Sequence, residues 1–564
     1  VDRIEICARG HESAVPVTKA ALNCSVLIHN HPSGVLIPSE ADLGIANRAA
    51  ENGQGFYIVD NEVFKIYVVV EPIKPKKLQK LDISYISSLL SAGGALDKIS
   101  ENFEERPAQV ELTKSIAKSF NNSLVGIFEA GTGVGKSYAY LIPSILWSLE
   151  NKERVVISTG TINLQQQLIE KDIPAAKKIT GKEVKAVLLK GRQNYVCLRR
   201  LADAGNERDL FSEDTELFDK IADWTKTTET GSRSDLAFNP PDQLWSRINS
   251  ESDACMGGRC PYRENCFVMK VRKDASDANI IVVNHHLLFA DIESRMNGAG
   301  YDDPAVLPPY HRIIFDEAHG IEDSATSFFS ETITRYKILK QVNLLFRMRH
   351  GSMSGLLQQI SVLSSEGDVS AKAAASVNAI KDSLMCLDEA ALESLDKDYT
   401  LRLYEATEIR FQPVLAELKK LSENLAAFIN IVRQVLNGIE EDDMDMPSVW
   451  ETKTIVRRLE AANVLCKSFM EWSEKEDTVF WMQVKKLLPK NSGEETIYFV
   501  ELTQTPLDIA PMMNTGVFEP ISTVVCTSAT LKTGVTFDFW MKRTGIKFAE
   551  PERISQGEFE SPFP

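Results

Sequence analysis

The chain has 564 residues, 43% of them hydrophobic and 25% charged, a balance typical of folded globular proteins with several domains. Its net charge of −16 excludes a uniformly basic nucleic-acid binder but allows a local basic groove on an acidic body. No apolar run reaches the ~20 residues of a membrane helix, and the nine cysteines come without a signal-peptide pattern, so we expect a cytoplasmic protein without disulfides or a membrane partner.

The first chemical pattern is SVLIHNHPSG, followed by PSEAD. On a strand His29 and His31 point to the same side, and Asp42 can join them from the first turn of a helix that Ser39 caps. Two histidines, a carboxylate and a water would make a zinc site with one open position.

HxHPSG followed by PSxxD resembles the RadC-like branch of the JAMM metalloproteases, and so does the β-rich run over residues 55–72. The resemblance implies a small α+β domain with zinc on His29, His31 and Asp42. The family also uses an upstream glutamate as general base, which we expect to precede Val1. A folded but inactive domain and histidines on a surface loop are the alternatives.

The sequence FEAGTGVGKSY has the pattern of a phosphate-binding loop between a strand and a helix. Its glycines turn backbone N–H groups toward one point, Lys136 would reach the β/γ-phosphates of ATP, and Ser137 would hold Mg²⁺. Ala130 stands where the strict motif has glycine, and AxTGxGKS resembles the variant of superfamily 2 helicases. A chance glycine-rich turn is the alternative. The expected nucleotide-binding residues are Ala130, Gly131, Thr132, Gly133, Val134, Gly135, Lys136 and Ser137.

Upstream of this loop, NFEERPAQVEL resembles the helicase Q-motif. The resemblance implies that Phe103 packs on adenine and Gln109 reads its edge, with Arg106 in the same segment. Downstream, RVVISTGT is a buried-type strand that ends in hydroxyl residues and resembles helicase motif Ia. That resemblance implies contacts with a single-stranded DNA backbone, although an ordinary strand-to-helix connection is the alternative. The expected motif Ia contacts are Thr159, Thr161 and Gln165.

An apolar strand ends in two carboxylates in HRIIFDEAH. Asp316 would hold Mg²⁺ through water, and Glu317 would orient and deprotonate the attacking water. DEAH resembles motif II of superfamily 2, which implies that His319 links the ATP site to motif III, here TSATL at 527–531. Lys136, Asp316 and Glu317 are therefore the expected catalytic residues.

Four cysteines, Cys197, Cys255, Cys260 and Cys266, separate the two ATP motifs. Four thiolates can bind zinc or an iron–sulfur cluster, and the absence of tight C-x₂-C pairs favours the cluster. The order phosphate loop, one cysteine, three close cysteines, NHHLL and DEAH resembles the XPD/DinG helicases, which implies a 4Fe–4S cluster on these residues. Zinc and unligated thiols are the alternatives.

Arginines, lysines and aromatic residues crowd the cysteine segment. Positive charge neutralises phosphates and aromatic rings stack on bases, although a solvated charged surface is the alternative. The expected DNA contacts here are Arg192, Tyr195, Arg199, Arg259 and Arg263.

The expected fold is α/β, with a RecA-like parallel-sheet motor lobe that carries an iron–sulfur insert and a helical arch insert after a small α+β JAMM-like domain. Apolar residues from Leu418 to Val435 alternate in steps of three and four and predict a long helix of the arch. The expected ranges are 1–75 for the JAMM-like domain, 76–100 for a linker, 101–190, 270–325 and 496–540 for the motor lobe, 191–269 for the cluster insert, 326–495 for the arch, and 541–564 for the start of a second lobe.

The resemblance implies an ATP-dependent DNA helicase that moves 5′→3′ on single-stranded or forked DNA in repair or replication. Its expected cofactors are ATP, Mg²⁺ and a 4Fe–4S cluster, with Zn²⁺ at the N-terminal site. The sequence starts at Val1 and shows no Q-x-x-G-R motif, so we expect a fragment that lacks the second lobe. Two alternatives are a JAMM peptidase tethered to DNA by an inactive motor lobe and a nucleic-acid-binding module without turnover.

Overall fold

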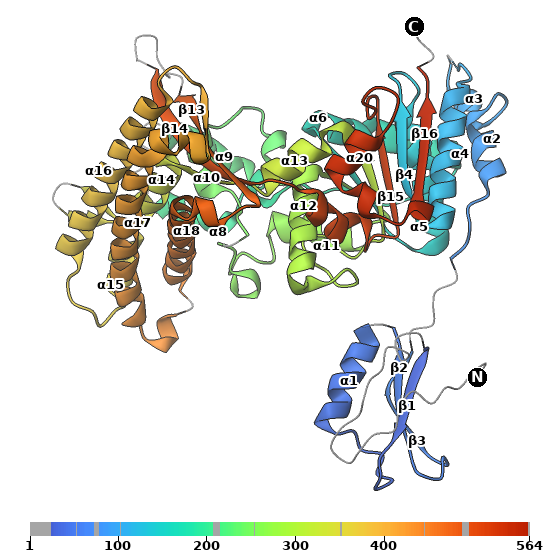
Figure 1. The fold of residues 1–564 in the computed structure, drawn as a ribbon, viewed down its shortest axis with the longest axis horizontal. Helices are drawn as coiled ribbons and strands as arrows, with labels where there is room; N and C mark the ends of the chain where they lie inside the picture. Colours follow the sequence, from blue (N-terminus) through green and yellow to red (C-terminus); the bar gives the residue numbers. More distant parts are fainter. Residues whose placement is uncertain are drawn as a thin grey trace. The chain divides into compact units, whose positions relative to one another are not determined.

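The chain forms two units, Val1–Gln79 and Lys80–Pro564, in the computed structural model drawn in Figure 1. None of the described helices is both long and apolar enough to cross a membrane. The structure describes residues 24–51, 53–72, 78–101, 103–206, 215–252, 254–349, 352–444, 446–487 and 496–561.

The described residues of the first unit form a three-stranded sheet with one helix packed on it. Strands β1 and β2 are parallel and β2 and β3 are antiparallel. Ala46 and Ala49 of the helix meet Phe56 and Ile58 of the sheet in a small core. Because the helix follows β1, its first turn lies near the end of that strand, where the candidate metal ligands are. The elements are β1 (Val26–Asn30), α1 (Glu40–Glu51), β2 (Gly55–Val59) and β3 (Ile66–Val70).

The expected linker over 76–100 is wrong for most of its length, because the second unit begins at Lys80. Asn121 exchanges two hydrogen bonds with the backbone of Leu81, at 2.7 and 3.0 Å. Ile86, Leu89 and Leu90 of the short helix that follows are buried, which a solvated linker would not allow. The first helices of this unit are α2 (Ile83–Leu90), α3 (Ala95–Ile99) and α4 (Pro107–Asn122).

A parallel seven-stranded sheet in the order β16-β4-β15-β8-β5-β7-β6 supports the second unit. Apolar side chains from α12, α13 and α20 share a core with one face of this sheet, and α4 contacts β4, β15 and β16 outside that core. The predicted α/β class with a parallel sheet is thus confirmed. The strands are β4 (Val125–Ala130), β5 (Val155–Thr159), β6 (Ala186–Leu188), β7 (Ile280–Asn284), β8 (Arg312–Asp316), β15 (Thr523–Ser528) and β16 (Ile554–Phe559). The helices between them include α5 (Lys136–Asn151), α6 (Ile162–Gln167), α7 (Ile173–Thr180), α12 (His285–Ser294), α13 (Ile321–Phe328), α19 (Ala510–Met513) and α20 (Asp538–Thr544).

The described residues of the range 541–564, up to Ser561, do not begin a separate lobe, contrary to the expectation. Strand β16 runs parallel to β4, from Ile554 opposite Val125 to Phe559 opposite Ala130, and forms the edge of the same sheet. An edge strand is only partly buried, and half of the residues in ISQGEF are polar. The composition of this segment therefore did not predict a strand of the sheet.

The segment between β6 and β7 holds the four expected cluster cysteines and has its own apolar core, which includes Phe218, Ile221, Trp245 and Phe267. We call it the cysteine insert. Its helices are α8 (Leu198–Asn206), α9 (Thr215–Trp224), α10 (Asp242–Ile248) and α11 (Phe267–Ser276).

The arch insert is not purely helical, which corrects the prediction for 326–495. Three long helices, α16, α17 and α18, share one core with an antiparallel sheet in the order β12-β13-β14-β9, at the opposite end of this unit from the seven-stranded sheet (Figure 1). Strand β14, which was expected in the motor lobe, belongs to this second sheet. The predicted helix from Leu418 to Val435 lies within α17, and its apolar residues are buried. The elements are β9 (Glu331–Thr334), α14 (Arg335–Leu345), β10 (Arg347–Arg349), β11 (Ser352–Ser354), α15 (Leu356–Ser361), α16 (Ser370–Leu395), β12 (Thr400–Leu403), α17 (Glu408–Asn437), α18 (Pro447–Met470), β13 (Thr478–Leu487) and β14 (Ile497–Pro506).

Candidate functional sites

The glycine loop connects the carboxyl end of β4 to the first turn of α5, as the sequence predicted. Gly133 and Gly135 have φ values of +79° and +89°, which other residues rarely adopt, and Lys136 and Ser137 open the helix. Four backbone N–H groups at such a helix start lack partners within the helix and can point at an anion. The loop therefore has the backbone form of a phosphate-binding site.

The Q-motif segment holds this loop from the side. Arg106 Nη1 donates to the Gly133 carbonyl at 2.8 Å, and Gln109 Nε2 donates to the Gly135 carbonyl at 2.9 Å. The Gln109 side chain is buried and in van der Waals contact with the loop, because a Cβ on Gly135 would lie 2.0 Å from Gln109 Nε2. In this structure Gln109 therefore positions the loop through Gly135, whereas the sequence assigned it to the adenine edge. Phe103 is half-buried.

Lys136 and Glu317 meet across the sheet, with Lys136 Nζ 3.4 Å from Glu317 Oε1. They come from the ends of β4 and β8, which are separated only by β15. Glu317 has φ +53°, an uncommon value for a residue with a side chain, and strain of this kind clusters at functional sites. The structure thus brings the three expected catalytic residues, Lys136, Asp316 and Glu317, to one edge of the sheet.

Asp316 is almost fully buried, and burial together with the charge of Glu317 raises its pKa to about 6. The Tyr140 hydroxyl donates a 3.0 Å hydrogen bond to Asp316 Oδ2. The sequence analysis did not identify Tyr140. Tyr140 follows Lys136 by one helical turn, so both side chains lie on one face of α5. This spacing could have identified Tyr140 from the sequence.

His319 contacts the motif III segment, as expected from the DEAH sequence. Its Nδ1 lies 2.8 Å from Ser528 Oγ, and Ser528 Oγ lies 3.4 Å from Glu317 Oε2. The glutamate expected to orient water is therefore tied through one serine to the end of β15. Ser528 was not among the predicted site residues, although it stands inside the quoted TSATL sequence.

The three residues expected to touch DNA at motif Ia differ in exposure. Thr161 is exposed and caps α6 by accepting a hydrogen bond from the Leu164 N–H at 3.3 Å. Thr159 and Gln165 are buried, and Thr159 Oγ1 and Gln165 Nε2 have no hydrogen-bond partner among the described residues. Of these three residues, only Thr161 is exposed to solvent in this structure.

The four cysteines line one small cavity in the cysteine insert, together with Arg199, Arg200 and Arg263 among other residues. Tetrahedral zinc with Zn–S bonds of about 2.3 Å would hold thiolates about 3.8 Å apart. Among the described residues, however, only the His29 group has three or more donor atoms within 4.8 Å of one another. No three of the four thiols therefore lie as close together in this structure as a single tetrahedral zinc ion would hold them.

Two of these thiols differ in their electrostatic surroundings. Burial raises the pKa of Cys197, although Arg199 and Arg200 act against it. Burial also disfavours the Cys255 thiolate, but the Gly257 N–H and Arg192 outweigh that effect and lower the pKa of Cys255. Arginines beside these two thiols favour the thiolate form, in which cysteine binds a metal.

Two of the predicted DNA contacts in this insert are wrong for this structure, because Tyr195 and Arg199 are each only 3% exposed. Arg199 donates to Asp203 at 2.9 Å, to the Ala254 carbonyl at 3.1 Å and to Glu451 of α18 at 3.3 Å. Arg192 is half-buried beside Cys255, whereas Arg259 and Arg263 are exposed. A charge pattern in sequence could not separate inward from outward arginines.

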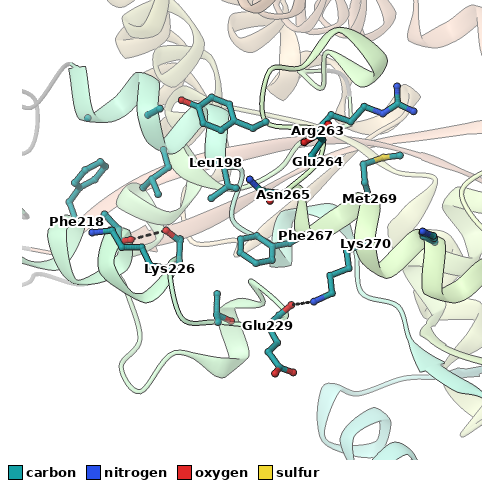
Figure 2. Close-up of a pocket in the computed structure, with 18 residues that line it drawn as sticks. Leu198, Phe218, Lys226, Glu229, Arg263, Glu264, Asn265, Phe267, Met269 and Lys270 are labelled. Carbon is teal, nitrogen blue, oxygen red and sulfur yellow. Dashed lines mark hydrogen bonds between the residues drawn. The ribbon is translucent and has the colours of Figure 1, made fainter.

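A groove of about 1360 Å³ lies on the cysteine insert (Figure 2). Leu198, Phe218 and Phe267 give it an apolar surface, and Lys270 and Arg263 stand on its border. Lys270 Nζ donates to the Glu229 carbonyl at 3.2 Å. Of the five predicted DNA contacts in this insert only Arg263 lines the groove, together with the nearby Tyr262, Lys270 and Lys273.

The first unit brings its three predicted ligands together. His29 Nε2 lies 3.1 Å from Asp42 Oδ1, and His31 Nε2 lies 3.0 Å from Asp42 Oδ2. The Ser39 N–H and hydroxyl both donate to Asp42 at 2.7 Å. Burial disfavours the Asp42 carboxylate, but these bonds outweigh it and the pKa of Asp42 is lowered. His31 Nδ1 lies 2.6 Å from the Val35 carbonyl, which leaves its Nε2 for a ligand. Two imidazoles and one anionic carboxylate at this spacing suit zinc.

No protein-family model matches the chain. It is 28% identical over 494 residues to the ATP-dependent DNA helicase YoaA of Haemophilus influenzae, which covers 85% of this chain and 67% of that protein. It is 34% identical over 248 residues to the ATP-dependent helicase DinG of Mycobacterium tuberculosis, which covers 41% of this chain and 36% of that protein. An XPD helicase structure matches with a TM-score of 0.39 and 14% identity over 81% of this chain and 63% of the other.

The chain thus spans at most about two thirds of the length of these curated relatives. The similarity to YoaA extends over most of the chain, and the same chain carries the glycine loop and DEAH strand of an ATP site. The chain is therefore similar in sequence to proteins named as DinG and YoaA helicases.

Proposed function

We propose that the chain is the ATP-binding part of a DinG-type DNA helicase. The observation that carries the proposal is the approach of Lys136 to Glu317 beside the glycine loop. Lys136 would meet the β/γ-phosphates, Ser137 and Asp316 would hold Mg²⁺, and Glu317 would orient the attacking water. Ser528 and His319 keep Glu317 in place. The names of the relatives support DNA as the second ligand.

Nucleotide binding tests this proposal directly. Lys136→Ala should abolish binding of a fluorescent ATP analogue, whereas Glu317→Gln should retain binding and reduce any hydrolysis by about 10²-fold or more. Lys152→Ala, at the other end of α5, is the matched control and should bind normally. Equal binding by Lys136→Ala and the control would refute the ATP site.

We further infer that Cys197, Cys255, Cys260 and Cys266 hold a 4Fe–4S cluster. The shared cavity, the spacing of the thiols and the arginines around them support this assignment. When bound, such a cluster can transfer an electron or serve as a structural brace. The residues of the chain itself supply the thiolate ligands and the compensating positive charge.

We place single-stranded DNA in the groove of the cysteine insert. Its apolar surface suits bases, and Lys270 and Lys273 suit phosphates. Replacing both lysines by alanine should weaken binding of an oligonucleotide and lower the salt slope by about one for each lost phosphate contact. Lys220→Ala is the control, because Lys220 lies on α9 of the same insert, does not line the groove and pairs with Glu216. Equal affinity and equal slope in all variants would contradict this path.

The first unit has a separate proposed role in binding zinc through His29, His31 and Asp42. The convergence of these three side chains supports it. When bound, zinc would act as a Lewis acid and lower the pKa of a water. Ser39 holds Asp42 in its orientation through two hydrogen bonds.

A further inference from the structure

Two histidine–serine contacts lie along the seven-stranded sheet, one beside the ATP residues and one behind the motif Ia turn. The first joins His319 Nδ1 to Ser528 Oγ at 2.8 Å, beside Glu317. The second joins His285 Nδ1 to Ser158 Oγ at 2.7 Å. Both contacts lie at the carboxyl ends of parallel strands, where sites in such sheets occur.

His285 is the first residue of α12 and is 2% exposed. Its ring packs near Phe289 and Phe315, the latter only one residue before Asp316. Burial, with further effects from His286 and His319, lowers the pKa of His285 to about 4, so the imidazole is neutral at pH 7. An apolar side chain would fill this buried position without a polar group that needs a hydrogen bond. Core packing alone therefore does not explain a neutral, hydrogen-bonded histidine here.

The other side of this histidine faces the turn expected to touch DNA. A Cβ on Gly160 would lie 3.9 Å from His285 Nε2, so the ring stands directly behind that turn. Ser158, its hydrogen-bond partner, precedes Thr159 and the exposed Gly160 and Thr161. His285 Nε2 is itself buried and has no hydrogen-bond partner among the described residues.

We propose that His285 is a positioning residue that couples the occupancy of the ATP site to the conformation of the Gly160–Thr161 turn. A shift of the DEAH segment when Glu317 and His319 engage nucleotide would move the neighbouring His285 ring. The hydrogen bond to Ser158 would carry that shift along β5 to the turn. This inference rests on the proposed function, because it requires that the chain bind both ATP and single-stranded DNA.

Reciprocal linkage provides the test. The dissociation constant of a labelled oligonucleotide is measured by fluorescence anisotropy with and without a non-hydrolysable Mg·ATP analogue. The affinity of the analogue is measured with and without the oligonucleotide. Coupling should change both constants by the same factor, about fivefold or more.

Four variants separate coupling from folding. His285→Asn keeps a polar atom near the Nδ1 position and should retain the coupling. His285→Phe keeps the aromatic packing, and Ser158→Ala removes the partner of the ring, so both should bind each ligand nearly normally but lose the coupling. His286→Ala changes the exposed neighbouring histidine and should behave like the unmodified chain. Circular dichroism and thermal melting check that all four are folded.

The possible results separate this inference from the proposed function. If the unmodified chain binds both ligands without coupling, or if folded His285→Phe retains the full coupling, this inference is wrong and the proposed function stands. If the unmodified chain fails to bind either ligand, the proposed function is wrong and the inference falls with it.

Discussion

The Tyr140 hydroxyl donates a 3.0 Å hydrogen bond to Asp316 Oδ2 inside the ATP site. The bond stabilises the carboxylate, and it lowers the pKa of Asp316 against the larger effect of burial, which raises it to about 6. Burial also raises the pKa of Tyr140 well above 10, so this hydroxyl stays a donor at any physiological pH.

Tyr140→Phe should therefore weaken Mg·nucleotide binding most at mildly acidic pH. Loss of the donor raises the pKa of Asp316 further, and the carboxylate proposed to hold Mg²⁺ forms only at higher pH. A titration of nucleotide affinity from pH 5 to 8 should show its midpoint moved upward. An unchanged midpoint would mean that Tyr140 does not control Asp316.

Asp316→Asn should stabilise the nucleotide-free chain at neutral pH. The folded protein binds more protons at Asp316 than the unfolded protein between about pH 4 and 6, so this group lowers stability as pH rises through that window. Removing the charge should gain about 1 to 3 kcal/mol at pH 8 and little at pH 4. Urea unfolding at both pH values measures the difference, and a loss of stability at pH 8 would contradict it.

Anaerobically purified protein should contain about four irons per chain and absorb in the visible range, as a 4Fe–4S cluster requires. Cys260→Ser should remove this absorption, because Cys260 is one of the four thiols at the shared cavity. Cys386→Ser is the control, since Cys386 is exposed on α16 and away from that cavity. Colourless protein without iron would refute the cluster.

The first unit should bind one zinc ion, and His31→Ala should remove it while leaving iron unchanged. His31 Nε2 faces Asp42 at 3.0 Å, so its loss opens the three-ligand set. Ser39→Ala should keep the ligands and the backbone N–H bond to Asp42 but remove the hydroxyl bond, and should weaken zinc affinity by about 10-fold. Equal zinc content in the unmodified chain and His31→Ala would exclude these ligands.

Arg199 ties the cysteine insert to the arch through Glu451, so Arg199→Ala should lower the stability of the second unit. Removing one partner of a buried ion pair costs about 3 kcal/mol or more, whereas Arg263→Ala, at an exposed arginine of the same insert, should cost under about 0.5 kcal/mol. Denaturation of the two variants provides the comparison. Similar midpoints would show that the link carries little stability.

Much of the ATP site could be predicted because its motifs are local. The turn at Gly133 and Gly135, the helix start at Lys136 and the strand that ends in Asp316 and Glu317 each depend on neighbouring residues. The four cysteines and the His29 group were likewise visible as spacings. The sequence predicted that the side chains of each set come together in space, and in the first unit His29, His31 and Asp42 do so.

The rest depended on contacts between segments far apart in the chain. The place of β16 is set by its pairing with β4, and its own half-polar sequence does not reveal this. The arginine at position 199 looked like a DNA contact, because a sequence shows charge but not the direction in which the side chain points. The helix residues Tyr140 and His285 became candidates only through their hydrogen-bond partners, Asp316 on β8 and Ser158 on β5, which are far away in the sequence. The sequence by itself determined which chemical groups are present and which local turns hold them. The tertiary structure alone decided which of those groups face one another, since that follows from strand order and burial.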